Sequence, residues 1–378
     1  MFFPSMKPIA ISNRTFFICF FLLWLLVQAV LFLKFGARTS VDSELYLTDA
    51  MNLLNGQLPK GRSIWYASYS AFLALIFFCG GNNTAVVFVQ ILLSGVATFC
   101  LYQIAMEMYG KRNVAILAVL FYLLWIKIHE WNTFLYTESL FTSCSIISFT
   151  VLMKSKNAWH YLAASLLVLF TFFIRPTGFA LLIGLLCFGM ASLRKEYLKR
   201  VIPLGFIGAI GVLVLLIGML ESFTLIESYA KAEIIYPNIT LGTEIPSDLY
   251  IPKANYSTLV RVFLFAVYNP VYFLKLFFLK LFLFLGNVKP YFSVFHNTVI
   301  LLILYPLYFF AVKGFLKFPS HRKEKYFVAG FAIAQALTVA LTSENWDGRF
   351  LVPLLPFVFL LAANGVCIIL KKERINDL

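Results

Sequence analysis

The stretch FFICFFLLWLLVQAVLFLKF, residues 16–35, carries a single charged side chain, Lys34, close to its end. A helix of about 20 apolar residues is long enough to cross the ~30 Å hydrocarbon core of a bilayer. The stretch follows Lys7 and Arg14, as the apolar part of a signal peptide would, but it is too long and lacks a small-residue cleavage site. We therefore expect it to remain in the protein as the first membrane span.

The whole chain shares this apolar character. Of its 378 residues, 61% are hydrophobic and only 13% are charged; 42 are phenylalanines, and the mean hydropathy is +0.86. A soluble domain could not bury so much apolar surface, and no polar block is long enough to fold alone. The composition predicts one membrane-embedded domain over residues 1–378.

Ten apolar runs satisfy or nearly satisfy the length that a membrane span needs. They lack the period-two alternation of barrel strands, so the sequence predicts an all-α polytopic membrane protein with about ten transmembrane helices. The runs are Phe16–Phe35, Thr84–Met106, Asn113–Ile128, Thr133–Met153, Ala158–Phe173, Gly178–Leu193, Val201–Leu220, Ser293–Val312, Tyr326–Thr342 and Phe350–Leu370.

Clusters of lysine and arginine orient these spans. They fall at alternate ends of successive runs, which places both termini in the cytoplasm. The formal net charge of +14 is then a consequence of topology and of contact with anionic membrane lipids, and it does not predict nucleic-acid binding. A bacterial plasma membrane is the location we expect. The clusters are Lys7/Arg14, Lys111/Arg112, Lys154/Lys156, Arg194–Arg200, Lys313–Lys325 and Lys371–Arg374.

Two further apolar segments, Trp65–Cys79 and Val262–Leu285, do not fit as spans, because counting either as a crossing inverts the charge pattern of the later loops. We expect them to be interfacial or re-entrant helices on the outer face. The alternative is that they are ordinary spans in a topology that disobeys charge. Our assignment gives the outer face two large loops, Gly36–Gly80 and Glu221–Phe292.

Polar residues that could do chemistry gather at the outer ends of the spans, where charged groups are costly unless they serve a purpose. Asp42, Glu44 and Tyr46 follow the first span, and we expect both carboxylates to point into one cleft from an irregular loop. For either acid alone, a solvated loop residue is the alternative. Next come His129, Glu130 and Tyr136, and then Glu138 just inside the fourth span. The favourable interaction of a carboxylate with a helix start is the alternative explanation for Glu138.

Two arginines lie at the same edge. Arg175 precedes Pro176-Thr177-Gly178, which break the helix, and its planar fork suits phosphate, although a lipid-headgroup anchor is the alternative. The last outer loop carries Glu344, Asp347 and Arg349, and a simple Asp347–Arg349 salt bridge is the alternative there. Acids and arginines from distant segments could thus converge at a membrane surface, which is typical of an active site.

The ordered set of these motifs resembles the GT-C membrane glycosyltransferases, most closely the branch of the protein mannosyltransferases and the aminoarabinose transferase of lipid A. The resemblance implies a polyprenyl-phosphate-linked sugar donor, a glycan, lipid or protein acceptor on the outer face, and inversion. It matches Asp42 to the family's base and Glu138 to a second acidic position. The motifs are Asp42-x-x-x-Tyr46, Tyr136-Thr137-Glu138-Ser139-Leu140, Arg175-Pro176-Thr177-Gly178 and Arg349-Phe350-Leu351-x-Pro353-x-x-Pro356.

General chemistry supports the same roles. Displacement at an anomeric carbon needs a base, which Asp42 could be, and fixed cations for the phosphate leaving group, which Arg175 and Arg349 could be. The family often has Asp-Glu where this chain has Asp42-Ser43, so a divalent metal held by an acidic pair stays open and no cofactor is certain. The chain also lacks the large C-terminal soluble domain of some relatives, so we expect the two outer loops to recognise the acceptor.

Two other classes of function remain. A multi-span transporter or lipid flippase would also have about ten spans and broken helices, but transporters usually place ionisable residues near the membrane midplane. A noncatalytic scaffold would show a random spread of outer charges.

The six cysteines lie in apolar runs without CxxC spacing, which argues against a disulfide framework or a zinc site. We expect them to be small core residues.

Overall fold

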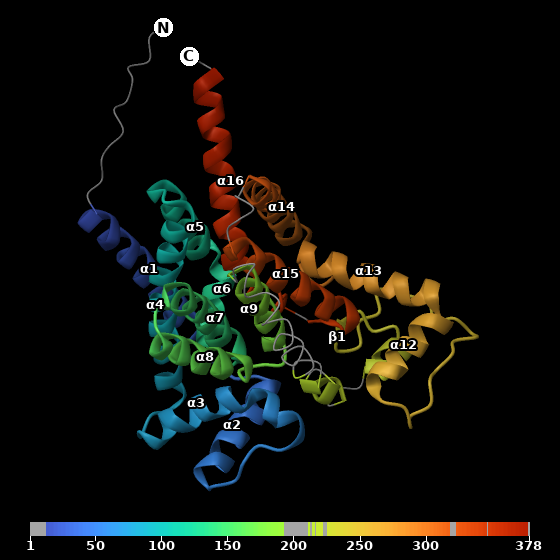
Figure 1. The fold of residues 1–378 in the computed structure, drawn as a ribbon. Helices are drawn as coiled ribbons and strands as arrows, with labels where there is room; N and C mark the ends of the chain where they lie inside the picture. Colours follow the sequence, from blue (N-terminus) through green and yellow to red (C-terminus); the bar gives the residue numbers. More distant parts are fainter. Residues whose placement is uncertain are drawn as a thin grey trace.

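The structure is a computed structural model that describes residues 13–192, 211, 214–215, 217–221, 225–317, 323–345 and 347–376. Helices dominate it, and two short parallel strands pair Ile235 with Glu344 (Figure 1). The all-α polytopic prediction is confirmed. The elements are α1 (Asn13–Phe35), α2 (Val41–Leu54), η1 (Gly61–Tyr66), α3 (Ala67–Phe78), α4 (Asn83–Tyr109), α5 (Arg112–Leu124), α6 (Ile126–Glu130), η2 (Trp131–Thr133), α7 (Thr137–Lys154), α8 (Ala158–Phe172), α9 (Gly178–Ser192), α11 (Leu225–Ala230), β1 (Ile235–Tyr236), α12 (Thr258–Tyr268), α13 (Pro270–Gly286), α14 (Val294–Leu316), α15 (Lys323–Leu341), β2 (Glu344–Asn345) and α16 (Leu355–Asn376).

Fewer helices than the expected ten can cross a membrane unaided. Among the described residues, α1, α4, α14 and α15 are long and apolar enough, and the number rises to six if the bent pairs α5–α6 and α12–α13 each count as one span. Helices α8 and α9 have 15 residues each, which at 1.5 Å per residue gives about 22 Å. The expected span Val201–Leu220 lies largely outside the described residues.

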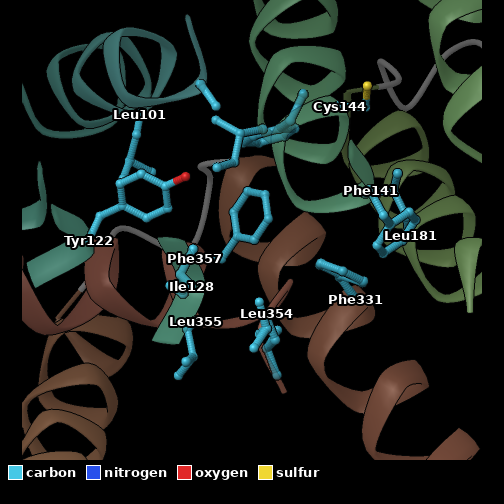
Figure 2. Close-up of a cluster of buried hydrophobic side chains, with 14 of the residues drawn as sticks. Leu101, Tyr122, Ile128, Phe141, Cys144, Leu181, Phe331, Leu354, Leu355 and Phe357 are labelled. Atoms are coloured by element: carbon cyan, nitrogen blue, oxygen red, sulfur yellow. The ribbon is translucent and has the colours of Figure 1, made fainter. Parts of the chain in front are cut away.

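Helix α7 runs through the interior of the bundle, and its serines and threonines are buried together with its apolar residues. The main core surrounds it. Figure 2 shows Phe357 of α16 between Leu101 and Tyr122 on one side and Phe141 and Phe331 on the other. Because side chains from α4, α5, α7, α15 and α16 meet there, this core fixes the start of α7 relative to the loop that precedes α16.

Glycines allow two of these helices to touch. A Cβ added to Gly314 of α14 would lie 2.0 Å from the carbonyl oxygen of Leu361 in α16, and one on Gly365 would lie 2.0 Å from that of Phe310. Small residues at such crossings let helix backbones approach closely, as is common in membrane bundles.

Contrary to the prediction from the sequence, the six cysteines are not all core residues: Cys100 and Cys144 are buried, whereas Cys19 and Cys79 are exposed.

Neither of the two segments that did not fit as spans forms one straight helix long enough to cross a bilayer. Helix α3 has 12 residues, about 18 Å, and lies with α2 at the end of the bundle opposite to the start of α1 and the end of α16 (Figure 1). Helices α12 and α13 meet at 111° where Asn269 is followed by Pro270, which begins α13. A small second core of Ile226, Tyr229 and Phe265, among others, joins α11 to this bent pair.

Candidate active site

Asp42 lies in the first turn of α2, and the expected irregular loop is therefore wrong. Ser43 Oγ accepts a hydrogen bond of 3.0 Å from the Ser40 amide and donates one of 3.0 Å to the Leu135 carbonyl oxygen, which fixes the helix start against the segment before α7. In a helix, residues two apart face different sides. The Asp42 side chain is one-third exposed and borders a pocket, whereas Glu44 is exposed away from it.

Three charged side chains from distant segments meet beside Asp42. Arg349 Nη1 donates to Asp42 Oδ2 at 2.7 Å, and Arg349 Nε donates to Glu138 Oε1. Arg175 Nη1 lies 3.2 Å from the same Glu138 oxygen. Glu138 is fully buried at the start of α7 and thus pairs with both arginines. We call Asp42, Glu138, Arg175 and Arg349 the pocket cluster.

Aromatic rings enclose this cluster. The Arg349 guanidinium lies 5.0 Å from the centre of the buried Tyr136 ring, and Tyr46, 1% exposed, packs 5.1 Å from Tyr66. Burial raises the pKa of Tyr46 well above its usual value, so its hydroxyl stays neutral. For Arg349, burial opposes the charged form, but the attraction of the Glu138 and Asp42 carboxylates raises its pKa above the usual value. Burial lowers the pKa of Arg175, and Glu138 opposes that shift.

The cluster opens into a cavity of about 290 Å³, near the lower limit of ~300 Å³ for small-molecule sites. Asp42, Arg175 and Arg349 line it, together with Arg62 of η1 and Thr177. Arg175 Nε and Thr177 Oγ1 are buried and have no hydrogen-bond partner among the described residues. Buried donors are nearly always satisfied, so their position at a cavity points to a ligand that accepts hydrogen bonds.

One comparison with known proteins gives a match to part of the chain. Residues 65–220 match the dolichyl-phosphate-mannose-protein mannosyltransferase family. This family is of the GT-C type, so the match confirms the resemblance noted from the motifs, and it indicates a membrane glycosyltransferase that uses a polyprenyl-phosphate sugar donor. The matched segment contains Glu138 and Arg175, whereas Asp42 and Arg349 lie outside it. Neither the curated proteins nor the solved structures provide a match.

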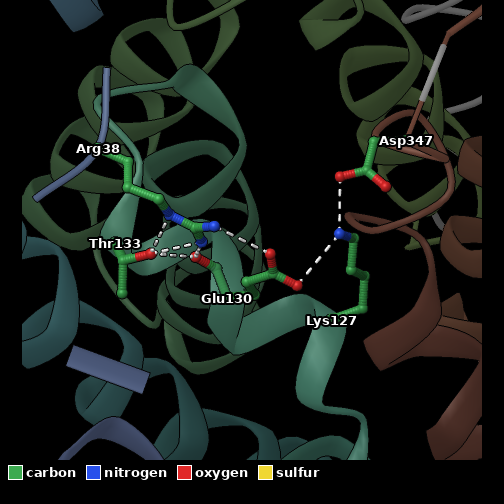
Figure 3. Close-up of polar contacts among 5 residues, drawn as sticks. All are labelled: Arg38, Lys127, Glu130, Thr133 and Asp347. Atoms are coloured by element: carbon green, nitrogen blue, oxygen red, sulfur yellow. Dashed lines mark hydrogen bonds and ion pairs between the residues drawn. The ribbon is translucent and has the colours of Figure 1, made fainter. Parts of the chain in front are cut away.

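A second set of charged side chains lies close in sequence to the pocket cluster. We call it the flanking chain, and its members are Arg38, Lys127, Glu130 and Asp347. Figure 3 shows Arg38 bound to Glu130 at 3.2 Å and to Thr133, Lys127 bound to Glu130 at 3.1 Å, and Lys127 bound to Asp347 at 2.7 Å. The Arg38 guanidinium also lies between the rings of Phe35 and Phe134, 3.9 and 3.8 Å from their centres. Through these ion pairs, the flanking chain connects α6 to Arg38, which precedes Asp42, and to Asp347, which precedes Arg349.

The remaining candidates from the sequence are placed as follows. Asp347 pairs with Lys127, so the alternative of an Asp347–Arg349 salt bridge is wrong. His129 is fully buried, 3.0 Å from both Gln28 Nε2 and the Tyr122 carbonyl oxygen, which occupies both ring nitrogens. Glu130 belongs to the flanking chain, Tyr136 packs under Arg349, and the Glu344 side chain lies outside what the structure describes.

Sequence reasoning missed Arg62 and Glu233, both of which line the cavity. Arg62 and the nearby Lys60 are two basic residues in the first predicted outer loop, and this pair was the signal that could have pointed to Arg62. Glu233 had no signal, because only the fold brings it to the cavity. Among the described residues, no group of three or more His, Cys, Asp or Glu is placed to hold a metal ion.

Proposed function

We propose that this glycosyltransferase moves a sugar from a polyprenyl phosphate to a hydroxyl-bearing acceptor at the Asp42 pocket, with inversion. The observation that carries the proposal is the pair of unpartnered buried donors, Arg175 Nε and Thr177 Oγ1, in the cavity that Asp42 borders. A phosphate offers only acceptor oxygens when ionised, and arginine offers only donors. The donor phosphate is thus the complementary ligand.

The charge balance of the cavity supports this ligand. At the end of the cavity that Arg62, Arg175 and Arg349 line, Asp42 and Glu138 offset two of the three positive charges, so one positive charge remains there. A sugar joined to a lipid through phosphate is a diester with one negative charge, which this excess neutralises. Such balance matters because unpaired buried charge is costly.

In the proposed reaction, the acceptor oxygen attacks the anomeric carbon on the face opposite to the phosphate, and Asp42 takes the proton from the acceptor hydroxyl. The bond between the anomeric carbon and the phosphate oxygen breaks, and its electron pair stays on the lipid phosphate. The phosphate gains one negative charge as Asp42 loses one, so the charge of the site is unchanged. The arginines stabilise the phosphate charge where it develops.

Glu138 takes a different role from the expected one of orienting the acceptor. Its side chain is fully buried, and it is absent from the cavity lining formed by the described residues. We assign it as a positioning residue that holds Arg175 and Arg349 side by side, since a single Glu138 oxygen contacts both guanidinium groups. Without it, the two like charges would repel each other.

The cavity also has an apolar part, formed by Met219, Leu220 and Val339, among others, which suits the first units of an isoprenoid tail. We place the cavity on the outer face of the plasma membrane with both termini in the cytoplasm, because the basic clusters alternate along the chain. The pocket cluster lies by α2, at one end of the bundle, and this favours an enzyme over a transporter with a midplane site.

Turnover of a radiolabelled polyprenyl-phosphate hexose by the purified full chain tests the proposal. Asp42→Asn keeps the shape of the side chain but removes the proton acceptor, so transfer should fall by at least about 100-fold while donor binding and thermal stability persist. Glu44→Gln, two residues away and exposed, is the matched control and should keep its activity. Near-normal transfer by Asp42→Asn would refute the assignment of Asp42 as the base.

Accessibility in intact cells tests the orientation. In a background without cysteine, single cysteines at the exposed positions Gln57 and Ser247 should react with an impermeant maleimide. A single cysteine at the exposed Asn113 should not react, because this residue lies at the start of α5, next to the basic pair Lys111/Arg112 that we expect in the cytoplasm. The reverse pattern would place the cavity in the cytoplasm.

A further inference from the structure

The cavity has a second part whose chemistry differs from that of the arginine end. Beside the exposed Tyr236 of β1, five polar side chains line this part, and they come from α11, the segment after it and the end of α15: Ser228, Glu233, Thr338, Thr342 and Ser343. The second core and the β1–β2 pairing bring these segments together. None of the five was a candidate from the sequence.

Three of the hydroxyl protons in this part are already engaged within the protein. Thr338 Oγ1 donates to the Ala334 carbonyl oxygen and Thr342 Oγ1 to that of Thr338, each at 2.7 Å. Ser343 Oγ donates to Glu233 Oε1 at 3.2 Å. A hydroxyl has one proton and two lone pairs, so what these three groups can still offer a ligand is lone pairs.

Glu233 also offers only lone pairs when ionised, and its charge is compensated. It is 4% exposed, and its Oε2 accepts a 2.9 Å hydrogen bond from the Asn238 amide. The buried Lys280, whose Nζ donates to the Thr342 carbonyl oxygen, is close enough for its charge to attract that of Glu233. The Glu233 carboxylate is thus held by two hydrogen-bond donors, the Asn238 amide and the Ser343 hydroxyl.

The three arginines thus donate hydrogen bonds at one end of the cavity, and the group of Glu233, Thr338, Thr342 and Ser343 accepts them at the other. We propose that the accepting end, built by Glu233, Thr338, Thr342 and Ser343, binds the sugar ring of the donor through the protons of its free hydroxyls. The proposal rests on the proposed function, in which the arginine end holds the phosphate. It defines the sugar as a neutral one with free hydroxyls, because a ring bearing a carboxylate or phosphate would face lone pairs without a proton between them.

Binding of two lipids to the purified full chain in nanodiscs tests the proposal: a polyprenyl phosphate without a sugar and a polyprenyl-phosphate hexose. Thr338→Val and Glu233→Gln should each weaken binding of the hexose lipid by about tenfold, because a sugar hydroxyl loses its acceptor. Binding of the bare lipid phosphate should not change. Thr150→Val is the matched control, since Thr150 makes the same bond to its own helix in α7, away from this cavity lining.

The proposed function and the sugar site are refuted by different results. If the unaltered protein does not bind the bare polyprenyl phosphate, the proposed function fails, and the sugar site fails with it. If it binds that lipid but both variants keep normal affinity for the hexose lipid, only the sugar site is refuted. Equal weakening of both lipids, or the same effect from Thr150→Val, would show a structural role and would also refute it. Thr338→Val alone decides the matter should Glu233→Gln fail to fold.

Discussion

The pocket cluster and the flanking chain each contain two acids and two bases, yet they differ in burial and in completeness. In the pocket cluster, Glu138, Arg175 and Arg349 have side chains that are 0%, 3% and 6% exposed. Those of the flanking chain are 10–30% exposed. The pocket cluster leaves a buried arginine donor without a partner among the described residues, whereas Arg38 uses Nε, Nη1 and Nη2 on Glu130 and Thr133.

This difference separates a binding site from a structural tie. Balanced charge alone does not mark a site, because both groups are balanced. An unsatisfied buried donor that borders a cavity is better evidence, since a ligand in that cavity can complete its hydrogen bonds. The flanking chain has no such opening and instead holds the segments that carry Asp42 and Arg349.

The largest expected effect is on stability, at Glu138. Glu138→Gln leaves two buried arginines without their shared counter-charge, so the free energy of unfolding should fall by about 3–5 kcal/mol. Denaturant unfolding of the purified chain in mixed micelles measures it, with Glu44→Gln as the control. Unchanged stability would contradict the assignment of Glu138 as the buried counter-charge that Arg175 and Arg349 share.

A smaller effect is expected on donor binding at Arg175. Arg175→Lys keeps a positive charge near Glu138 but loses Nε, so binding of a bare polyprenyl phosphate should weaken by about tenfold. The matched control is Arg38→Lys in the flanking chain, which should bind this lipid normally. Equal weakening by both substitutions would remove the functional distinction between the clusters.

Arg38→Lys should itself lower stability by about 1–2 kcal/mol, because lysine cannot make the hydrogen bonds to Glu130 and Thr133 together with the contacts to Phe35 and Phe134. Unfolding in the same micelles measures the change. A large loss of turnover without loss of stability would instead bring Arg38 into the reaction.

The smallest effect is expected at Asp347, where burial raises the pKa of the carboxyl above its usual value and the attraction of Lys127 opposes that shift. A pKa that is higher in the folded state contributes stability below the unfolded value of about 3.9, and this contribution is lost as the pH rises through the folded pKa. Asp347→Asn should therefore change stability by about 1 kcal/mol or less at neutral pH. The advantage of the native protein over this variant should shrink between pH 4 and pH 7 in thermal unfolding; growth of that advantage would contradict the sign.

Several elements of the site could be read from the sequence because their signals are local. Arg175 stands beside a proline and a glycine that end a helix, and Glu138 stands at a helix start within an apolar run. The conformation around Asp42 could not be read so well. Ser40 and Ser43 begin α2 there, and the bond from Ser43 to Leu135 that secures this start joins residues 92 positions apart.

By itself, the sequence determined that the chain is a helical membrane protein, because the length and apolarity of its runs leave the backbone no other way to satisfy its hydrogen bonds in lipid. It also determined which charged residues deserved attention, since such residues are costly near a membrane. Only the tertiary structure decided that Arg349 pairs with Asp42 and Glu138 while Asp347 pairs with Lys127. Residues two apart in a short loop can turn to either side, and the packing of α7, α6 and α16 sets which partner each one meets.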